Sequence, residues 1–224
     1  TKEEFQFLRE EIPQALDESL EGLGRIASIV NAMKQFAHPG VAEKEPTDLN
    51  KAVETTATVA RNKWKYVADL ELDLDPNLPL VPCNVNEINQ VLLNLIVNAA
   101  DAIEEASKKG REDKGKIIVS TRHNQKWAEI RVTDTGTGIP PEIQPKIFDP
   151  FFTTKQVGRG SGQGLSLARS IVQRHKGEIF FQTEVGKGTT FFVRLPLQQE
   201  NHIEQDYGDE ECSSESEYSL STTT

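Results

Sequence analysis

The chain has 224 residues and a formal net charge of -10, and residues 200–224 carry eight acidic side chains with no lysine or arginine. The first 199 residues are therefore close to neutral, so neither part has the basic surplus that favours binding to a nucleic-acid backbone. Cys83 and Cys212 lie far apart and do not indicate a disulfide framework or a zinc site, and without a signal peptide or an apolar run of roughly 18 residues we expect a cytoplasmic segment with no membrane contact.

Residues 3–37 form the first predicted element, a long amphipathic helix with apolar side chains at every third or fourth position. Pro13 interrupts the pattern near its start, and His38-Pro39-Gly40 ends it. A lone amphipathic helix exposes its apolar stripe to water, so this helix needs a partner helix from this chain or from a second copy. The alternative is an ordinary helix packed on the domain that follows.

A mixed pattern of elements follows a linker at residues 41–46. Helices are expected at 49–61, 86–106 and 164–175, with a short one near 141–147, and strands at 67–74, 115–121, 127–133, 178–184 and 189–195. Helices gathered against one mixed sheet predict an α/β fold, a two-layer sandwich of a mixed β-sheet with helices on one face, preceded by the long helix. Residues 200–224 are rich in Glu, Ser and Thr and are expected to form a disordered acidic tail.

The helix expected at 86–106 carries two asparagines one turn apart, Asn94 and Asn98, beside its apolar stripe. Asparagine is a poor residue for the interior of a helix, and solvated faces usually use Lys, Glu and Arg. A neutral carbonyl oxygen suits Mg²⁺, which prefers oxygen ligands and keeps waters and phosphates in its shell. The alternative is a solvated helix face.

The run Asp134-Thr-Gly-Thr-Gly-Ile-Pro140 directly follows an expected strand. Its glycines allow the backbone to turn and to approach a flat ligand closely. A carboxylate at the end of the strand can accept a hydrogen bond from an exocyclic amine, such as that of adenine. The alternative is a turn in which the aspartate bonds only to local backbone N–H groups.

A glycine-rich run at residues 158–164 precedes the helix expected at 164–175. Backbone N–H groups at the start of a helix, together with the positive end of its dipole, form an anion site suited to a di- or triphosphate. The run is neither a P-loop, because no Gly-Lys-Ser/Thr follows, nor a Rossmann fingerprint, because it follows a long loop. The alternative is a flexible surface loop without a ligand.

Five motifs in this order resemble the asparagine box, first glycine box, phenylalanine box, second glycine box and final Gly-x-Gly-Thr of the catalytic ATP-binding domain of sensor histidine kinases, members of the Bergerat-fold superfamily. The likeness covers residues 47–197, which implies a catalytic domain at 47–199. The preceding residues 1–40 resemble the second helix of the family's dimerisation hairpin. The motifs are Asn94–Asn98, Asp134–Gly138, Phe148–Lys155, Gly158–Leu165 and Gly186–Phe191.

The resemblance implies that the domain binds ATP with Mg²⁺, and that Asn98 holds the metal. Asp134 would bond the adenine amino group, with Gly138 close to the ring and Thr189 helping through a water. Phe148–Lys155 and the glycine run would form a mobile lid, in which Lys155 or Arg159 could neutralise charge on the transferring phosphoryl group.

The resemblance therefore predicts a set of site residues. The expected catalytic residues are Asn94, Asn98 and Lys155, with Asn98 as the metal ligand. The residues expected to contact the nucleotide are Asn98, Asp101, Asp134, Gly136, Gly138, Ile139, Phe148, Thr154, Lys155, Gly158, Arg159, Gly160, Ser161, Gly162, Gln163, Gly164, Leu165 and Thr189.

Asn94 separates a kinase from a hydrolase. ATP-hydrolysing members of the superfamily place a glutamate four residues before the metal-binding asparagine, whereas Asn94 cannot act as a base. Transfer to a neutral imidazole needs no strong base, so a kinase is favoured. Hydrolysis stays open, because Asp101 could substitute as the base, and so does a non-enzymatic nucleotide-binding dimerisation module. The resemblance does not extend to Asp101-Ala102, where Lys-Tyr or Lys-Phe is frequent in the family.

No histidine has the setting of a phosphoacceptor, which is usually followed by Glu or Asp in the middle of a helix. The four histidines are His38, His123, His175 and His202, and none has an acidic residue after it. We therefore expect a fragment that transfers the γ-phosphoryl group to a histidine outside it. The resemblance further implies a homodimer through the N-terminal helix and a response-regulator receiver domain as partner, and the intact protein could be membrane-anchored.

Overall fold

The computed structural model describes residue 12 and residues 44–198, apart from 109, 111, 112 and 156–159. The helix expected at 3–37, except residue 12, and the acidic tail at 200–224 lie outside the described residues. None of the helices that the structure describes combines the length and apolar character of a membrane span.

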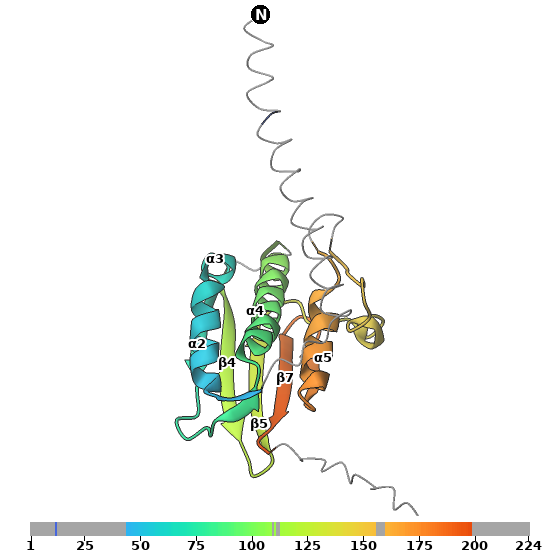
Figure 1. The fold of residues 1–224 in the computed structure, drawn as a ribbon. Coiled ribbons are helices and arrows are strands. Elements are labelled where there is room, and N and C mark those ends of the chain that lie inside the picture. The colour runs from blue at the N-terminus through green and yellow to red at the C-terminus, as the bar shows by residue number, and fades with distance from the viewer. Residues whose placement is uncertain (1–11, 13–43, 109, 111–112, 156–159, 199–224) are drawn as a thin grey trace, which may run out of the picture.

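The described residues form a two-layer α/β sandwich, which confirms the predicted fold class (Figure 1). Three helices lie side by side on one face of a five-stranded sheet: α2 (Leu49–Val59), α4 (Val85–Lys108) and α5 (Gly164–Arg174). The strand order is β2-β4-β5-β7-β6, and only the pairing of β2 with β4 is parallel. These strands are β2 (Ala68–Asp73), β4 (Gly115–His123), β5 (Trp127–Asp134), β6 (Glu178–Glu184) and β7 (Gly188–Pro196).

Short elements account for the differences from the sequence prediction. The helix expected at 49–61 ends at Val59, and a separate turn of helix, α3 (Arg61–Trp64), follows. The region near 141–147 forms only the 3-10 helix η1 (Gln144–Lys146). Strands β1 (Glu45–Thr47) and β3 (Val81–Cys83) pair antiparallel and were not predicted, so part of the expected linker belongs to a small second sheet. A strand of three residues is too short to show an alternating pattern.

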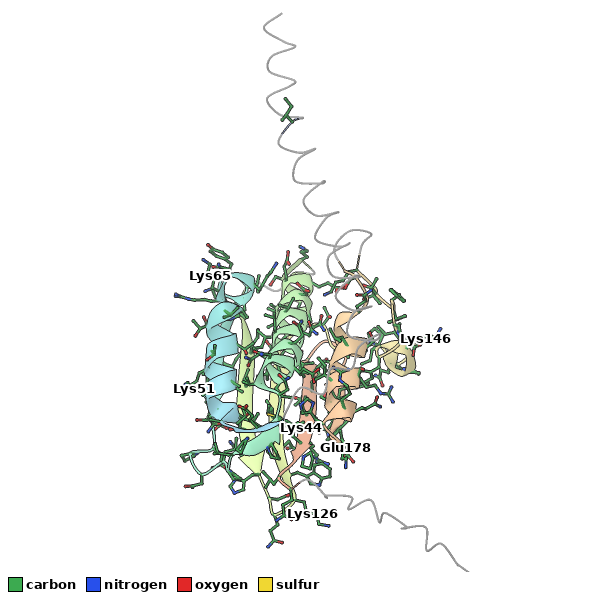
Figure 2. All side chains as sticks on the ribbon, viewed as in Figure 1. Lys44, Lys51, Lys65, Lys126, Lys146 and Glu178 are labelled. Carbon is green, nitrogen blue, oxygen red and sulfur yellow. The ribbon has the colours of Figure 1, made fainter. Side chains whose placement is uncertain are left out.

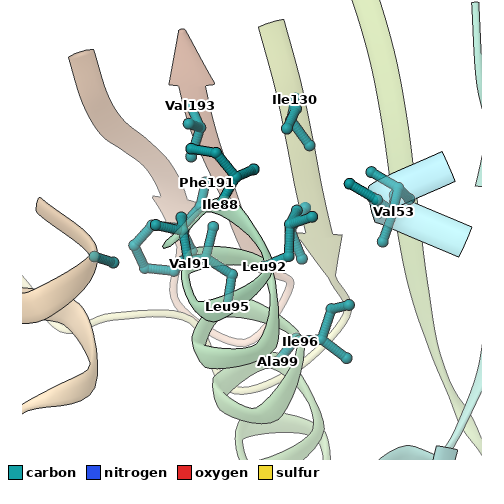
Figure 3. Close-up of a cluster of buried hydrophobic side chains, with 14 of the residues drawn as sticks. Val53, Ile88, Val91, Leu92, Leu95, Ile96, Ala99, Ile130, Phe191 and Val193 are labelled. Atoms are coloured by element: carbon teal, nitrogen blue, oxygen red, sulfur yellow. The ribbon is translucent and has the colours of Figure 1, made fainter. Parts of the chain in front are cut away.

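The core lies between α4 and the large sheet. The Asn84 side chain accepts hydrogen bonds from the backbone N–H groups of Asn86 (2.9 Å) and Glu87 (3.2 Å), which fixes the start of α4. Figure 3 shows apolar side chains of α4 facing the sheet strands and α2. Burial of each large aliphatic side chain contributes about 1.5–3 kcal/mol. The fully buried members on α4 are Ile88, Leu92, Leu95, Ile96 and Ile103.

The opposite face of the sheet is polar, because the helices cover one face only. Glu129 on β5 accepts hydrogen bonds from Arg131 (2.7 Å) and Arg194 (2.6 Å). The two guanidinium groups lie over the rings of Phe192 and Phe180, which stack with their centroids 4.8 Å apart. In Figure 2 the labelled side chains of Lys51, Lys65, Lys126 and Lys146 lie at the periphery of the domain. Ion pairs and stacked rings thus replace a second helical layer.

The start of β7 predicts a difference between two glycine substitutions. Gly186 and Gly188 both have positive φ, 82° and 133°, so alanine at either position costs about 1–2 kcal/mol of backbone strain. An added Cβ at Gly186 meets no described atom within 4 Å, whereas one at Gly188 would lie 1.9 Å from the Asp134 carbonyl oxygen. We expect Gly188→Ala to lower the free energy of unfolding, measured by urea denaturation, clearly more than Gly186→Ala. Equal losses would contradict this backbone contact.

Candidate functional site

Asp134 ends β5 as a buried carboxylate that is only 5% exposed. One of its oxygens accepts a hydrogen bond from the backbone N–H of Gly136 at 2.8 Å, and the backbone N–H of Thr189, its register partner on β7, also donates to it. A carboxylate has about four acceptor positions. Asp134 therefore keeps acceptor capacity for a donor on a ligand.

The pKa of Asp134 is raised to about 6, chiefly because burial disfavours its charged form. The hydrogen bonds from Gly136 and Thr189 act in the opposite direction and offset only part of this effect. The carboxylate therefore titrates just below neutral pH. A ligand that donates a hydrogen bond to it stabilises the charged form and lowers its pKa.

The turn after Asp134 fits between α4 and the β6–β7 connection only because it contains glycines. An added Cβ at Gly136 would lie 2.6 Å from the Ala102 Cβ, and one at Gly138 (φ 70°) would lie 2.3 Å from the Glu184 carbonyl oxygen. The backbone N–H of Thr137 donates to the Ala102 carbonyl oxygen at 3.3 Å. A small residue at position 102 therefore lets the Asp134 turn lie directly on α4.

Thr183 on β6 holds the far side of this turn, a role that no local sequence pattern indicates. Its hydroxyl oxygen accepts from the Ile139 backbone N–H at 2.9 Å, and its hydroxyl donates to the Gly188 carbonyl oxygen at 3.1 Å. Thr189 Oγ1 lies 2.9 Å from Thr183 Oγ1. One hydroxyl thus links Ile139 to the start of β7, which brings Ile139 and Thr189 together.

Asn94 joins α4 to the start of α5. Its Nδ2 donates to the Gly164 carbonyl oxygen at 3.0 Å, and its Oδ1 accepts from Gln90 Nε2 at 3.2 Å. The amide therefore has hydrogen-bond partners at both ends. Its position fixes where the helical N–H groups of α5 begin relative to α4.

Asn98 lies one turn further along α4, beside a cation supplied by another segment. Lys155 Nζ donates to Asn98 Oδ1 at 3.3 Å and forms an ion pair with Asp101. The Asp101 and Lys155 side chains are 38% and 35% exposed, which leaves access for water and phosphate. The lysine ammonium acts here as a stand-in ion, and it shows that this oxygen is placed to bind a cation. An amide oxygen beside a carboxylate fits Mg²⁺.

The second glycine run packs against the phenylalanine segment. An added Cβ at Gly162 (φ 66°) would lie 2.4 Å from the Phe151 carbonyl carbon, and one at Gly160 would lie 2.8 Å from Thr153 Oγ1. The run then enters α5, where Gln163 is the N-cap residue and its side chain makes no capping hydrogen bond in the described part. The first turn of α5 therefore directs its backbone N–H groups outward, as an anion site requires.

Comparison with known proteins gives the family. The model of the histidine kinase-, DNA gyrase B- and HSP90-like ATPases matches residues 83–199, about half of the chain. The chain belongs to this ATPase family. Its matched region contains the asparagine pair on α4, the Asp134 turn and the glycine run, so the family assignment and the geometry concern the same residues.

Relatives of this ATPase domain are sensor histidine kinases. The sensor kinase CckA of Brucella abortus is 36% identical over 79% of this chain and 19% of its own length. The sensor protein FixL of Bradyrhizobium diazoefficiens is 31% identical over 85% of this chain and 36% of its own length. The chain thus spans a fifth to about a third of the length of these two relatives.

Solved structures agree with this assignment. The catalytic domain of histidine kinase ThkA has a TM-score of 0.59 and 29% identity, and the match covers 69% of this chain and 96% of that domain. ThkA in complex with the response regulator TrrA has a TM-score of 0.62 and 27% identity, covering 79% of this chain and 48% of that one. The domain described here is therefore an ATP-binding domain of the histidine kinase type.

Hydrogen bonds and an ion pair of the ATPase domain bring ten of the predicted site residues into two groups. Gly158 and Arg159 lie outside the described residues, and Thr154 and Ser161 are exposed. Phe148 lies against Phe181, with ring centroids 6.1 Å apart, and under Arg169. Leu165 packs against the core. One group is Asp134, Gly136, Gly138, Ile139 and Thr189; the other is Asn94, Asn98, Asp101, Lys155 and Gly164.

The raised pKa of Asp134 predicts how nucleotide binding by the ATPase domain depends on pH. If Asp134 accepts from an adenine amino group as predicted, its ionised form is the stronger acceptor, so binding is strongest above the pKa and weakens as the pH falls through about 6. We expect the dissociation constant for ADP, measured by calorimetry between pH 7.5 and 5, to rise up to about tenfold per pH unit below that value.

Asp134→Asn is the matched control, because it leaves the titration of the nucleotide phosphates unchanged. We expect this variant to bind ADP weakly at pH 7.5 and to lose the part of the pH dependence that Asp134 supplies. The same pH profile in both proteins, or unchanged affinity in Asp134→Asn, would contradict the adenine contact.

Proposed function

We propose that the chain is the catalytic core of a two-component sensor histidine kinase, which binds Mg-ATP and transfers the γ-phosphoryl group to a histidine outside residues 1–224. The observation that carries this proposal is Asn94. Its amide replaces the carboxylate expected of a hydrolase, and both of its ends are engaged, with Gln90 and with Gly164. An amide cannot deprotonate water, so attack by an acceptor that needs no strong base is favoured.

The geometry supports a role for each group of site residues. Asp134 would accept a hydrogen bond from the adenine amino group, and Gly138 would allow the ring to approach the backbone. The N–H groups at the start of α5 would bind phosphate oxygens. Asn98 would be the protein ligand of Mg²⁺, which neutralises phosphate charge when bound. Lys155, whose ammonium already lies beside Asn98, would add a positive charge at the phosphoryl group.

The proposed partners follow from the relatives. One structure shows histidine kinase ThkA in complex with its response regulator TrrA, which supports a receiver domain as a partner of this chain. The helix expected at 3–37 is proposed to mediate a homodimer, because its apolar stripe requires a partner. A cytoplasmic location stays a prediction.

ATP hydrolysis is the second candidate function, and one observation supports it. Asp101 is a carboxylate one turn beyond Asn98 on α4, and it could substitute for the base that the hydrolases carry at the position of Asn94. Its carboxylate is occupied by the ion pair with Lys155. The two candidates make opposite predictions when no acceptor is present.

Phosphoryl transfer tests the proposal directly. With labelled ATP and a separately supplied dimerisation hairpin that carries an acceptor histidine, we expect acid-labile phosphate on the hairpin and none on this chain. Release of free phosphate without the hairpin, abolished in Asp101→Asn, would establish the hydrolase instead. Nucleotide binding with neither transfer nor release would indicate a non-enzymatic module.

Asn98→Ala tests the metal assignment. Without the amide oxygen we expect ADP affinity to become independent of Mg²⁺ while some binding remains, and transfer to fall about 100-fold or more. Asn89→Ala is the matched control on the same helix, because Asn89 Oδ1 accepts a hydrogen bond from Thr56 Oγ1 on α2 (3.2 Å) and Asn89 is not a predicted site residue. Calorimetry with Mg²⁺ or with EDTA gives both affinities. Retained Mg²⁺ dependence in Asn98→Ala would contradict the assignment.

A further inference from the structure

The ion pair between Lys155 and Asp101 joins two segments that are 54 residues apart in sequence. Asp101 belongs to α4, which is fixed in the core. Lys155 belongs to the phenylalanine segment, which packs against the second glycine run. The pair therefore connects the most rigid element of the site to the segment expected to cover the phosphates.

The same ammonium also reaches the proposed metal ligand. Asn98 and Asp101 are three residues apart and lie on one face of α4. Lys155 Nζ contacts both side chains, with 3.3 Å to Asn98 Oδ1. The carboxylate thus draws the ammonium onto the amide oxygen.

The stem of Lys155 is also held in place. Its backbone N–H donates to Thr153 Oγ1 at 3.2 Å. Its Cβ and Cδ lie against Gly160, where an added Cβ would come within 3.2 and 3.1 Å of them. The lysine is therefore placed by contacts at both ends of its side chain.

We propose that Asp101 is a positioning residue that acts through Lys155: it holds the lysine ammonium on Asn98 Oδ1, so that Lys155 and Mg²⁺ compete for the same oxygen. The proposal rests on the proposed role of Asn98 as metal ligand. Two cations on one oxygen repel each other, so metal binding requires the ammonium to move. Asp101 then sets how much free Mg²⁺ the domain needs before nucleotide binds tightly.

Competition between Lys155 and Mg²⁺ predicts in which direction two substitutions change the Mg²⁺ requirement of ADP binding. Lys155→Gln removes the competing cation, and Asp101→Asn loosens it, so both should lower the Mg²⁺ concentration that half-saturates ADP binding. The contribution of an exposed ion pair corresponds to a change of about two- to fivefold. If Asp101 instead attracted the metal directly, Asp101→Asn would raise the half-saturating concentration. ADP is the probe because it lacks the γ-phosphate, which Lys155 is proposed to contact.

The experiment is a double-mutant cycle on the 224-residue chain, with calorimetric titration of Mg²⁺ at fixed ADP. The proposal is supported if Asp101→Asn lowers the half-saturating Mg²⁺ concentration and this decrease is absent in the Lys155→Gln background. No decrease, or the same decrease in both backgrounds, overturns it. Asp101→Glu should restore the wild-type value. Lys116→Gln and Glu71→Gln, which change an exposed pair elsewhere (2.7 Å), should leave it unchanged.

A measurement without nucleotide separates this inference from the proposed function. In the nucleotide-free chain, the NMR signal of the Asn98 side-chain amide should shift in both Asp101→Asn and Lys155→Gln, and not in Lys116→Gln. If the chemical shift of the Asn98 side-chain amide is the same in Asp101→Asn as in the wild type, the positioning role is overturned, even if ADP binds normally. Absence of ADP binding with the expected NMR shifts would instead count against the proposed nucleotide site alone.

Discussion

The packing of α4 on the large sheet is the constraint on which the rest of the structure depends. One face of this helix supplies the centre of the core, including Leu92 and Leu95, and the adjoining face carries Asn94, Asn98 and Asp101. Because the two faces belong to one helix, burial of the apolar face fixes the position of the polar side chains. The hydrophobic effect thereby stabilises the geometry of the site.

The two ends of the site use different electrostatics. At one end, Asp134 is a buried carboxylate whose charged form is disfavoured by burial, so a hydrogen-bond donor on a ligand would stabilise that charge. At the other end, Asn98 and Asp101 are half-exposed beside Lys155, so water and counter-ions screen them. The proposed contacts to the base and to the phosphates therefore depend on different residues with different exposure to solvent.

The fold and the turn after Asp134 could be predicted from the sequence, because each depends on a pattern of neighbouring residues. The 3.6-residue period gave α4, and the glycines after Asp134 indicated its turn. The ion pair of Lys155 with Asp101 and the role of Thr183 depend on which segments meet in three dimensions. No local pattern encodes such meetings, and the same is true of β1 and β3, whose three-residue strands exist only through pairing.

The hydrogen bond from Asn94 to Gly164 has a mechanical consequence. It fastens the beginning of α5 to the helix that carries Asn98, so the proposed anion site and the proposed metal ligand keep one relative position. At the start of α5 this link is a hydrogen bond from the Asn94 side-chain amide to the Gly164 carbonyl oxygen, so its loss would let the start of α5 shift relative to α4.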